Sequence, residues 1–265
     1  QKLLPKEEIK KVKFDTVGGG LTAIGVTGVL LFLSTFSYFI LFSSMIVLLL
    51  MWRHINQVTM PFIQPKLLKE KQYLKLLFIG FVAFVTHFST LFLMPIILTD
   101  VFGKDPAEVG LMIFPGAILS AVAAQFIGRL IDRFGNGPLI YFGQLFLFIA
   151  TVLFTLLSTK SPYFILLTYM FMSTGFSALT SSIANEVSRI LPTEEIGTGM
   201  GMTQLIQFFG GAFGVTLTGI MITLQDGLAV ELIYRHIFGG LVVLITIAII
   251  MFRFYIKGRL NSTHG

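Results

Sequence analysis

The sequence predicts an all-α, polytopic membrane protein with eight transmembrane helices. Three observations support this fold class: the composition, the spacing of long apolar segments and the distribution of lysine and arginine. Of the 265 residues, 55% are hydrophobic and only 12% are charged, and the mean hydropathy is +0.87. A soluble globular domain carries about 25% charged residues. The low charge therefore indicates that lipid surrounds most of this chain.

The apolar segments have the length of membrane spans. They comprise residues 17–36, 38–52, 74–98, 107–127, 139–158, 162–184, 198–224 and 237–256. The first two form an almost unbroken run, which as one helix would be about 54 Å long, against a hydrocarbon core of about 30 Å. We therefore predict a helical hairpin that turns within Ser34-Thr35-Phe36-Ser37. No segment alternates in the manner of a membrane barrel strand.

The positive charges agree with eight spans. If both termini lie on one side, sixteen of the 19 lysines and arginines fall on that side, and only Lys104, Lys160 and Arg235 fall on the other. Cytoplasmic loops carry such an excess of positive residues. We therefore expect both termini of this chain to be cytoplasmic. Because the charge follows the membrane edges, the net charge of +6 does not indicate a nucleic-acid partner.

Catalytic and metal-binding groups are scarce. The chain has no cysteine, and its four histidines, His54, His87, His236 and His264, show no ligand spacing. We therefore predict no enzyme activity, no metal and no cofactor.

A charged segment separates the fourth and fifth spans. It reads Gly128-Arg129-Leu130-Ile131-Asp132-Arg133-Phe134-Gly135, and we predict that it forms a short loop. Asp132 is expected to accept hydrogen bonds from a neighbouring helix N-terminus or to pair with an arginine, and so to hold a gate closed in one of two conformers. Gly128 and Gly135 would allow close helix approach and a tight turn. The alternative is that Arg129 and Arg133 only anchor the topology.

Several motifs occur in a family-specific order. They are the 128–135 segment, Phe14-Asp15-Thr16-Val17-Gly18, the stretch from Arg53 through Val58 to Pro65, Ile113-Phe114-Pro115-Gly116 and Gly210-Gly211-Ala212-Phe213-Gly214. Together they resemble the major facilitator superfamily, and within it the fourteen-helix drug:proton antiporters. These include bacterial tetracycline, quinolone and quaternary-ammonium efflux pumps. The resemblance covers nearly the whole chain.

The resemblance implies a division of the chain. The expected parts are a cytoplasmic connector (1–16), an inserted transmembrane hairpin (17–52), a cytoplasmic loop (53–73), a six-helix C-terminal bundle (74–256) and a cytoplasmic tail (257–265). The chain begins at Gln1 with a charged segment, so we expect it to be the C-terminal portion of a longer protein. Its partners would be membrane lipid, lipophilic substrates and an N-terminal six-helix half of the same protein.

The same resemblance implies a function. It is proton-coupled export of lipophilic, often cationic drugs by alternating access in the bacterial cell membrane, with the proton gradient as energy source. A tetracycline-type or other small-molecule exporter is the alternative within the family. However, Phe208 and Phe209 stand where tetracycline-specific members carry a carboxylate, which favours a multidrug pump. A non-transporting membrane scaffold or partner subunit is the alternative of a different class.

Two titratable residues are candidates for a proton or substrate pathway. His87 falls near the middle of the third predicted span, where a polar side chain is expensive, and histidine changes charge near neutral pH. The alternative is a neutral histidine that is hydrogen-bonded to a neighbouring helix. Glu186, near the cytoplasmic end of the sixth span, is either a pathway residue or an interfacial one.

The seventh span carries a small-and-polar stripe on one helix face. We assign its glycines, Gly210, Gly211 and Gly214, to helix packing and its glutamines, Gln204 and Gln207, to the substrate cavity. Aromatic side chains near span centres suit lipophilic cations. The aromatic candidates for the substrate pathway are Phe84, Phe88 and Phe208.

Overall fold

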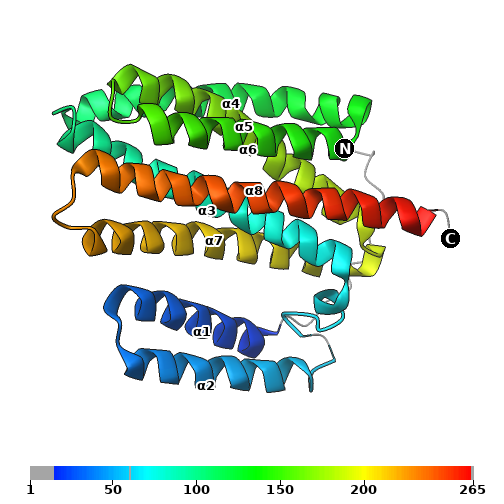
Figure 1. Ribbon diagram of the computed structural model, residues 1–265. Coiled ribbons are helices and arrows are strands. Elements are labelled where there is room, and N and C mark those ends of the chain that lie inside the picture. The colour runs from blue at the N-terminus through cyan, green and yellow to red at the C-terminus, as the bar shows by residue number, and fades with distance from the viewer. Residues whose placement is uncertain (1–14, 60, 264–265) are drawn as a thin grey trace, which may run out of the picture.

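The computed structural model describes residues 15–59 and 61–263, and every regular element in those ranges is helical. Eight of the helices are long and apolar enough to cross a membrane, so the predicted fold class is confirmed. They pack as a bundle of six with a separate hairpin beside it (Figure 1). The predicted connector, apart from Asp15 and Thr16, and the last two residues of the predicted tail lie outside the described residues.

The helix boundaries follow the predicted spans closely at the hairpin and less closely in the bundle. The helices are α1 (Thr16–Thr35), α2 (Tyr38–Ile55), α3 (Lys71–Asp100), α4 (Pro106–Phe134), α5 (Asn136–Leu157), α6 (Pro162–Ile190), α7 (Ile196–Leu224) and α8 (Val230–Thr263). Two short 3-10 helices, η1 (Leu67–Lys69) and η2 (Thr193–Glu195), precede α3 and α7. The hairpin turns within the predicted four residues, at Phe36, where the backbone is left-handed (φ 51°).

Two boundaries differ from the prediction in a way that matters for the site. α4 continues through the 128–135 segment to Phe134, so only Gly135, with φ 79°, separates it from α5. α8 continues to Thr263, through most of the residues predicted as a tail. Hydropathy marks the part of a helix that lies in hydrocarbon, whereas backbone hydrogen bonding continues into the charged residues beyond it. The expected loop at 128–135 is therefore wrong: residues 128–134 form the last two turns of α4, and only Gly135 lies outside a helix.

The bundle consists of two groups of helices. α3 packs against α7 and α8, and α6 packs against α4 and α5. The two groups meet where α5 packs against α8 and where α3 packs against α6. Figure 1 shows α4, α5 and α6 on one side and α7 on the other, with α3 and α8 between them. α3 is the most buried helix, with fully buried Leu76, Ile79, Leu93 and Ile97 along its length. α3 therefore forms the centre of the apolar core.

The α1–α2 hairpin is a separate layer that contacts the bundle through α1 and α7. Gly25 of α1 lies close to Leu48 of α2, and Gly28 lies close to Ser44, so the two arms approach each other at small residues. Both arms expose large apolar side chains, among them Phe39 and Phe42, which are 81% and 69% exposed. Such exposure of large apolar side chains is typical of helices that face lipid.

Asp15 fastens the start of the hairpin to the chain that leads into the bundle. Its carboxylate is 6% exposed and accepts hydrogen bonds from the Gly18 N–H at 2.8 Å and from the Phe62 N–H at 3.0 Å. His54 Nε2 lies 2.8 Å from the same carboxylate. Burial acts to raise the pKa of Asp15, but these hydrogen bonds outweigh burial and hold the pKa below its ordinary value.

Candidate functional site

An aromatic cluster joins α3, α6 and α7 near the middle of the bundle. The ring of His87 stacks on that of Phe176, with 3.9 Å between centroids and 7° between planes. Phe84 contacts three rings, with centroid distances of 5.6 Å to Phe88, 5.1 Å to Phe176 and 5.6 Å to Phe208. The structure therefore brings together four of the predicted pathway residues, Phe84, His87, Phe88 and Phe208.

His87 lies inside this cluster rather than at its edge. Its side chain is 8% exposed, and its Nδ1 atom has no hydrogen-bond partner among residues 15–59 and 61–263. The ring of Tyr169, also on α6, is a second neighbour, with its centroid 6.0 Å from that of His87. Aromatic contacts, and not a hydrogen bond from a neighbouring helix, therefore hold the imidazole in the described structure.

The cluster opens toward one face of the bundle through Phe208. This side chain is 61% exposed, and Gln204, one turn earlier on α7, is exposed as well. Gln207 instead points into the bundle: it is 2% exposed, and its side chain lies against Gly80 of α3. Of the two glutamines assigned to a cavity, only Gln204 lies on an open face of this chain.

The glycines of α7 lie where α7 approaches α3 most closely. A Cβ atom on Gly210 would lie 2.7 Å from the Phe81 carbonyl oxygen, and one on Gly214 would lie 2.8 Å from the Val85 carbonyl oxygen. A Cβ on Gly211 would lie 3.2 Å from the ring of Phe88. Gly210 and Gly214 admit only glycine at the observed helix separation, because the atoms opposite them are backbone atoms.

The charged end of α4 has few partners within this chain. Arg129, Asp132 and Arg133 are all exposed. The two guanidinium groups lie over phenylalanine rings of their own helix, 5.1 Å from the centroid of Phe126 and 5.2 Å from that of Phe134. Asp132 makes no hydrogen bond or ion pair in the part of the chain that the structure describes.

Of the two glycines in this segment, only Gly135 has a conformational role in the structure. Its positive φ lets the chain reverse within one residue between α4 and α5. Gly128 faces open space, since a Cβ atom there would meet nothing within 4 Å.

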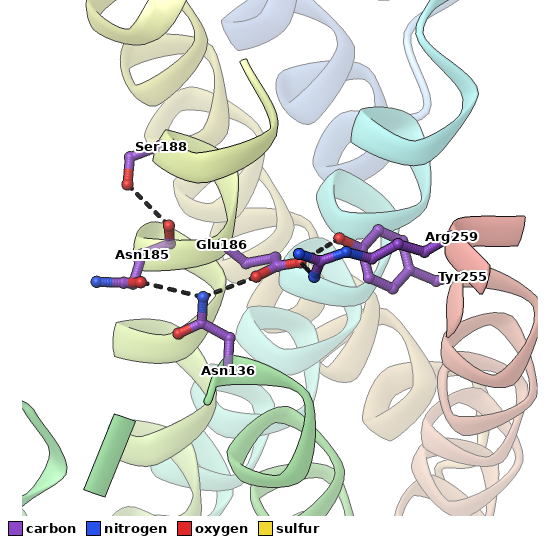
Figure 2. A network of polar contacts seen from close by, with 6 residues as sticks. All are labelled: Asn136, Asn185, Glu186, Ser188, Tyr255 and Arg259. Atoms are coloured by element: carbon purple, nitrogen blue, oxygen red, sulfur yellow. Dashed lines mark hydrogen bonds and ion pairs between the residues drawn. The ribbon is translucent and has the colours of Figure 1, made fainter. Parts of the chain in front are cut away.

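A buried polar network joins α5, α6 and α8 beside this segment (Figure 2). Glu186 is 1% exposed. Its Oε2 atom accepts a hydrogen bond from Asn136 Nδ2 at 2.7 Å, and its Oε1 atom accepts one from the Tyr255 hydroxyl at 2.5 Å. Arg259 forms an ion pair with the same Oε1 atom. Asn136 Nδ2 also donates to Asn185 Oδ1 at 3.0 Å.

This network compensates the burial of the Glu186 charge. An unpaired buried carboxylate is strongly unfavourable, whereas here one cation and two neutral donors share it. Because its donors come from α5 and α8, the carboxylate holds the ends of three helices together. This role has only a partial signal in the sequence: Asn136 directly follows Gly135, and Tyr255 and Arg259 are four residues apart on one helix face.

Among the described residues, no group of three or more histidine, aspartate or glutamate side chains is placed to hold a metal ion.

Comparison with known proteins finds relatives that are named as transporters or as a drug resistance protein. The chain is 29% identical over 140 residues to an uncharacterized MFS-type transporter, YhcA, of Bacillus subtilis, an alignment that covers 52% of this chain and 26% of that protein. It is 26% identical over 181 residues to the lincomycin resistance protein LmrB of Listeria innocua, and this alignment covers 67% of this chain and 37% of LmrB. It is 22% identical over 168 residues to the multidrug transporter protein MdtP of Bacillus subtilis, and this alignment covers 63% of this chain and 31% of MdtP.

The chain thus spans about a quarter to a third of the length of these curated relatives. Among solved structures, it resembles a bacterial metal transporter with a TM-score of 0.56 and 15% identity, over 90% of this chain and 62% of that one. At this identity the likeness concerns the fold alone.

The sequence profile described as Major Facilitator Superfamily matches residues 76–263, which include all six helices of the bundle. Membership of this family indicates a transporter rather than an enzyme. The chain belongs to the major facilitator superfamily.

Proposed function

We propose that this chain is the C-terminal part of a proton-coupled multidrug exporter, which moves lipophilic and often cationic compounds out of the bacterial cell by alternating access. The observation that carries the proposal is the aromatic cluster around Phe84 and His87, which reaches an open face at Phe208. Aromatic faces attract cations and bury apolar surface without demanding one hydrogen-bonding pattern. The names of two relatives, a lincomycin resistance protein and a multidrug transporter, support the same substrate class.

An N-terminal six-helix half would complete the substrate cavity. The face of α7 that carries Phe208 also exposes Gln204, one helical turn earlier. A face with large aromatic and amide groups is expected to lie against a second bundle with a cavity between the two. The distribution of lysine and arginine supports a cell-membrane location with both termini of this chain cytoplasmic.

Proton coupling is the part of the proposal that depends most on residues outside this chain. His87 is the local candidate, since the other buried titratable network, around Glu186, lies at the helix ends. Asp132 would act differently: exposed and without a partner in the described bundle, it is free to contact the other half in one conformer of a rocking transporter.

Dye accumulation in cells that express the full-length protein tests the proposal. We expect Phe208→Ala to raise the accumulation of a lipophilic cation such as ethidium several-fold, because a lost cation–π contact corresponds to about 1 kcal/mol. Phe254→Ala is the matched control, since Phe254 is 57% exposed on α8, away from the cluster. Equal export by both variants would show that Phe208 does not contact the transported substrate.

Two further measurements on the same cells separate the remaining claims. A protonophore should abolish export, and export that persists would refute proton coupling. Asp132→Asn should reduce export while leaving the amount of folded protein unchanged, and unimpaired export would exclude Asp132 from the gate.

A further inference from the structure

An apolar groove runs between α4 and α5 at the end of the bundle where these helices meet. Both helices pack more extensively on α6 than on each other, so α6 forms the floor of the groove. The groove has a volume of about 660 Å³. The residues that define it are Phe126, Leu130 and Phe134 of α4, Phe142 and Phe146 of α5, and Ala178 of α6.

The lining of the groove offers no free side-chain hydrogen-bond donor to an occupant. Thr174 is the single polar side chain among its described lining residues, and its hydroxyl donates to the Met170 carbonyl of its own helix at 2.9 Å. Such a groove binds by burial of apolar surface alone. Hydrocarbon is therefore the chemistry that fits its interior.

The mouth of the groove, in contrast to its apolar interior, carries positive charge. Phe126 and Phe134 line the groove, and the guanidinium groups of Arg129 and Arg133 lie over these two rings. Neither arginine forms an ion pair with a carboxylate in the described parts of the chain. Asp132 is two residues from both Leu130 and Phe134, and thus about 200° around the helix from these groove positions. Two cations therefore stand at the end of an apolar groove without a facing anion.

The start of α5 adds to the positive potential at this end. α5 begins at Asn136, and no side chain caps its first turn, so the positive end of its dipole lies beside the two arginines. An apolar partner helix in the groove would leave these charges unpaired, whereas a molecule with a long hydrocarbon chain and an anionic head satisfies both ends.

We propose that this groove binds one acyl chain of an anionic glycerophospholipid, whose phosphate is held by Arg129 and Arg133. The lipid would fill the space between α4 and α5 and support the end of α4 that carries Asp132. The site is independent of the transported substrate, because it lies on the α4–α5 side of the bundle and shares no residue with the cluster around His87.

Native mass spectrometry of the full-length protein, released from nanodiscs of phosphatidylcholine mixed with phosphatidylglycerol, tests the proposal. We expect phosphatidylglycerol to remain bound to the unmodified protein. The double variant Arg129→Gln/Arg133→Gln should weaken the binding of phosphatidylglycerol about 30-fold, since each basic residue near a membrane surface contributes about 1 kcal/mol toward an anionic lipid. The control Arg189→Gln/Arg253→Gln removes two exposed arginines from α6 and α8 and should leave occupancy unchanged. Equal losses in both double variants would overturn the site.

A photo-crosslinking residue at Leu130 identifies what occupies the groove. Leu130 is 42% exposed and lines the groove. Adducts to lipid are expected, whereas adducts to another segment of the protein would show that protein covers the groove and would refute the proposal. Ala178→Phe, which fills the floor, should abolish the lipid adduct while a thermal-unfolding scan confirms that the variant is folded.

Discussion

The imidazole ring of His87 and the phenyl ring of Phe176 form a parallel stack that ties α3 to α6, with centroids 3.9 Å apart. The histidine is therefore part of the aromatic packing, whether or not its nitrogen atoms also move protons. Stacked aromatic pairs contribute about 0.5–1.5 kcal/mol beyond the burial of their area.

Substitution of His87 separates packing from proton chemistry. We expect His87→Ala to lower the free energy of unfolding by about 3 kcal/mol, because it leaves a cavity between α3 and α6. His87→Phe should retain the stack and unfold at nearly the temperature of the unmodified protein, as measured by thermal unfolding in detergent. A His87→Ala protein of unchanged stability would contradict the packing role.

If His87→Phe folds but its export no longer depends on the pH gradient, the imidazole nitrogen is required for coupling.

The Glu186 network predicts an asymmetry between its two charged partners. Glu186→Ala removes the acceptor of the buried Tyr255 hydroxyl and one of the two acceptors of Asn136, so we expect a loss of about 2–4 kcal/mol in the free energy of unfolding. Arg259→Gln should cost less, about 1 kcal/mol, because the arginine side chain is 47% exposed and Glu186 keeps two donors. Chemical unfolding in detergent measures both.

The exposed pair of Lys104 and Glu108 provides the control for that comparison. Lys104 Nζ lies 2.7 Å from Glu108 Oε1, but both side chains reach solvent. Lys104→Gln is expected to leave stability unchanged. The asymmetry would be refuted if Arg259→Gln destabilised the protein more than Glu186→Ala did.

The close approach of α7 to α3 predicts which glycine tolerates a methyl group. We expect Gly214→Ala to lower the free energy of unfolding by about 1–3 kcal/mol, because the new Cβ would lie 2.8 Å from the Val85 carbonyl oxygen and the helices must separate. Gly219→Ala, on the same helix, should be neutral or slightly stabilising, since nothing lies within 4 Å of its Cβ position. Equal thermal stability of the two variants would show that α7 moves away from α3 at little cost.

The sequence predicted the helices well because hydropathy and the distribution of positive charge act on every span. The spacing of Gly210 and Gly214 likewise indicated a packing face, and the structure places both against α3 carbonyl groups. The partners of Glu186 were not predictable in the same way, because Asn136 and Arg259 come from helices whose neighbours depend on the three-dimensional packing.

The charged 128–135 segment shows a second limit of sequence reasoning. Charge and glycine suggested a loop, but arginine and leucine are good helix formers, and α4 ends only where Gly135 adopts a positive φ. The position of Gln207 is a similar case. Its place on the polar stripe suggested a cavity, whereas the absence of a side chain at Gly80 creates the space into which Gln207 packs.

The attachment of the hairpin should depend on pH through Asp15. Hydrogen bonds hold the pKa of this carboxyl below its ordinary value of 3.8, so the ionised form is favoured in the folded state. A group with a lowered pKa contributes stability that is fully present above its ordinary pKa and is lost as the pH falls through the lowered value. The contribution is therefore complete at neutral pH and disappears only in acid, below about pH 3.8.

Hydrogen exchange at the amides of Gly18 and Phe62 measures this attachment directly, because both amides donate to Asp15. At neutral pH, Asp15→Asn should accelerate exchange at both amides severalfold relative to the unmodified protein, because a neutral amide oxygen accepts hydrogen bonds less strongly than a carboxylate. In acid the difference between the two proteins should shrink, once the intrinsic exchange rate at each pH is divided out. Asp105→Asn is the matched control, since Asp105 caps α4 in the same way at a distant site and should leave Gly18 and Phe62 unaffected. A difference that persists undiminished at the lowest pH would show that the charge of Asp15 does not hold the hairpin.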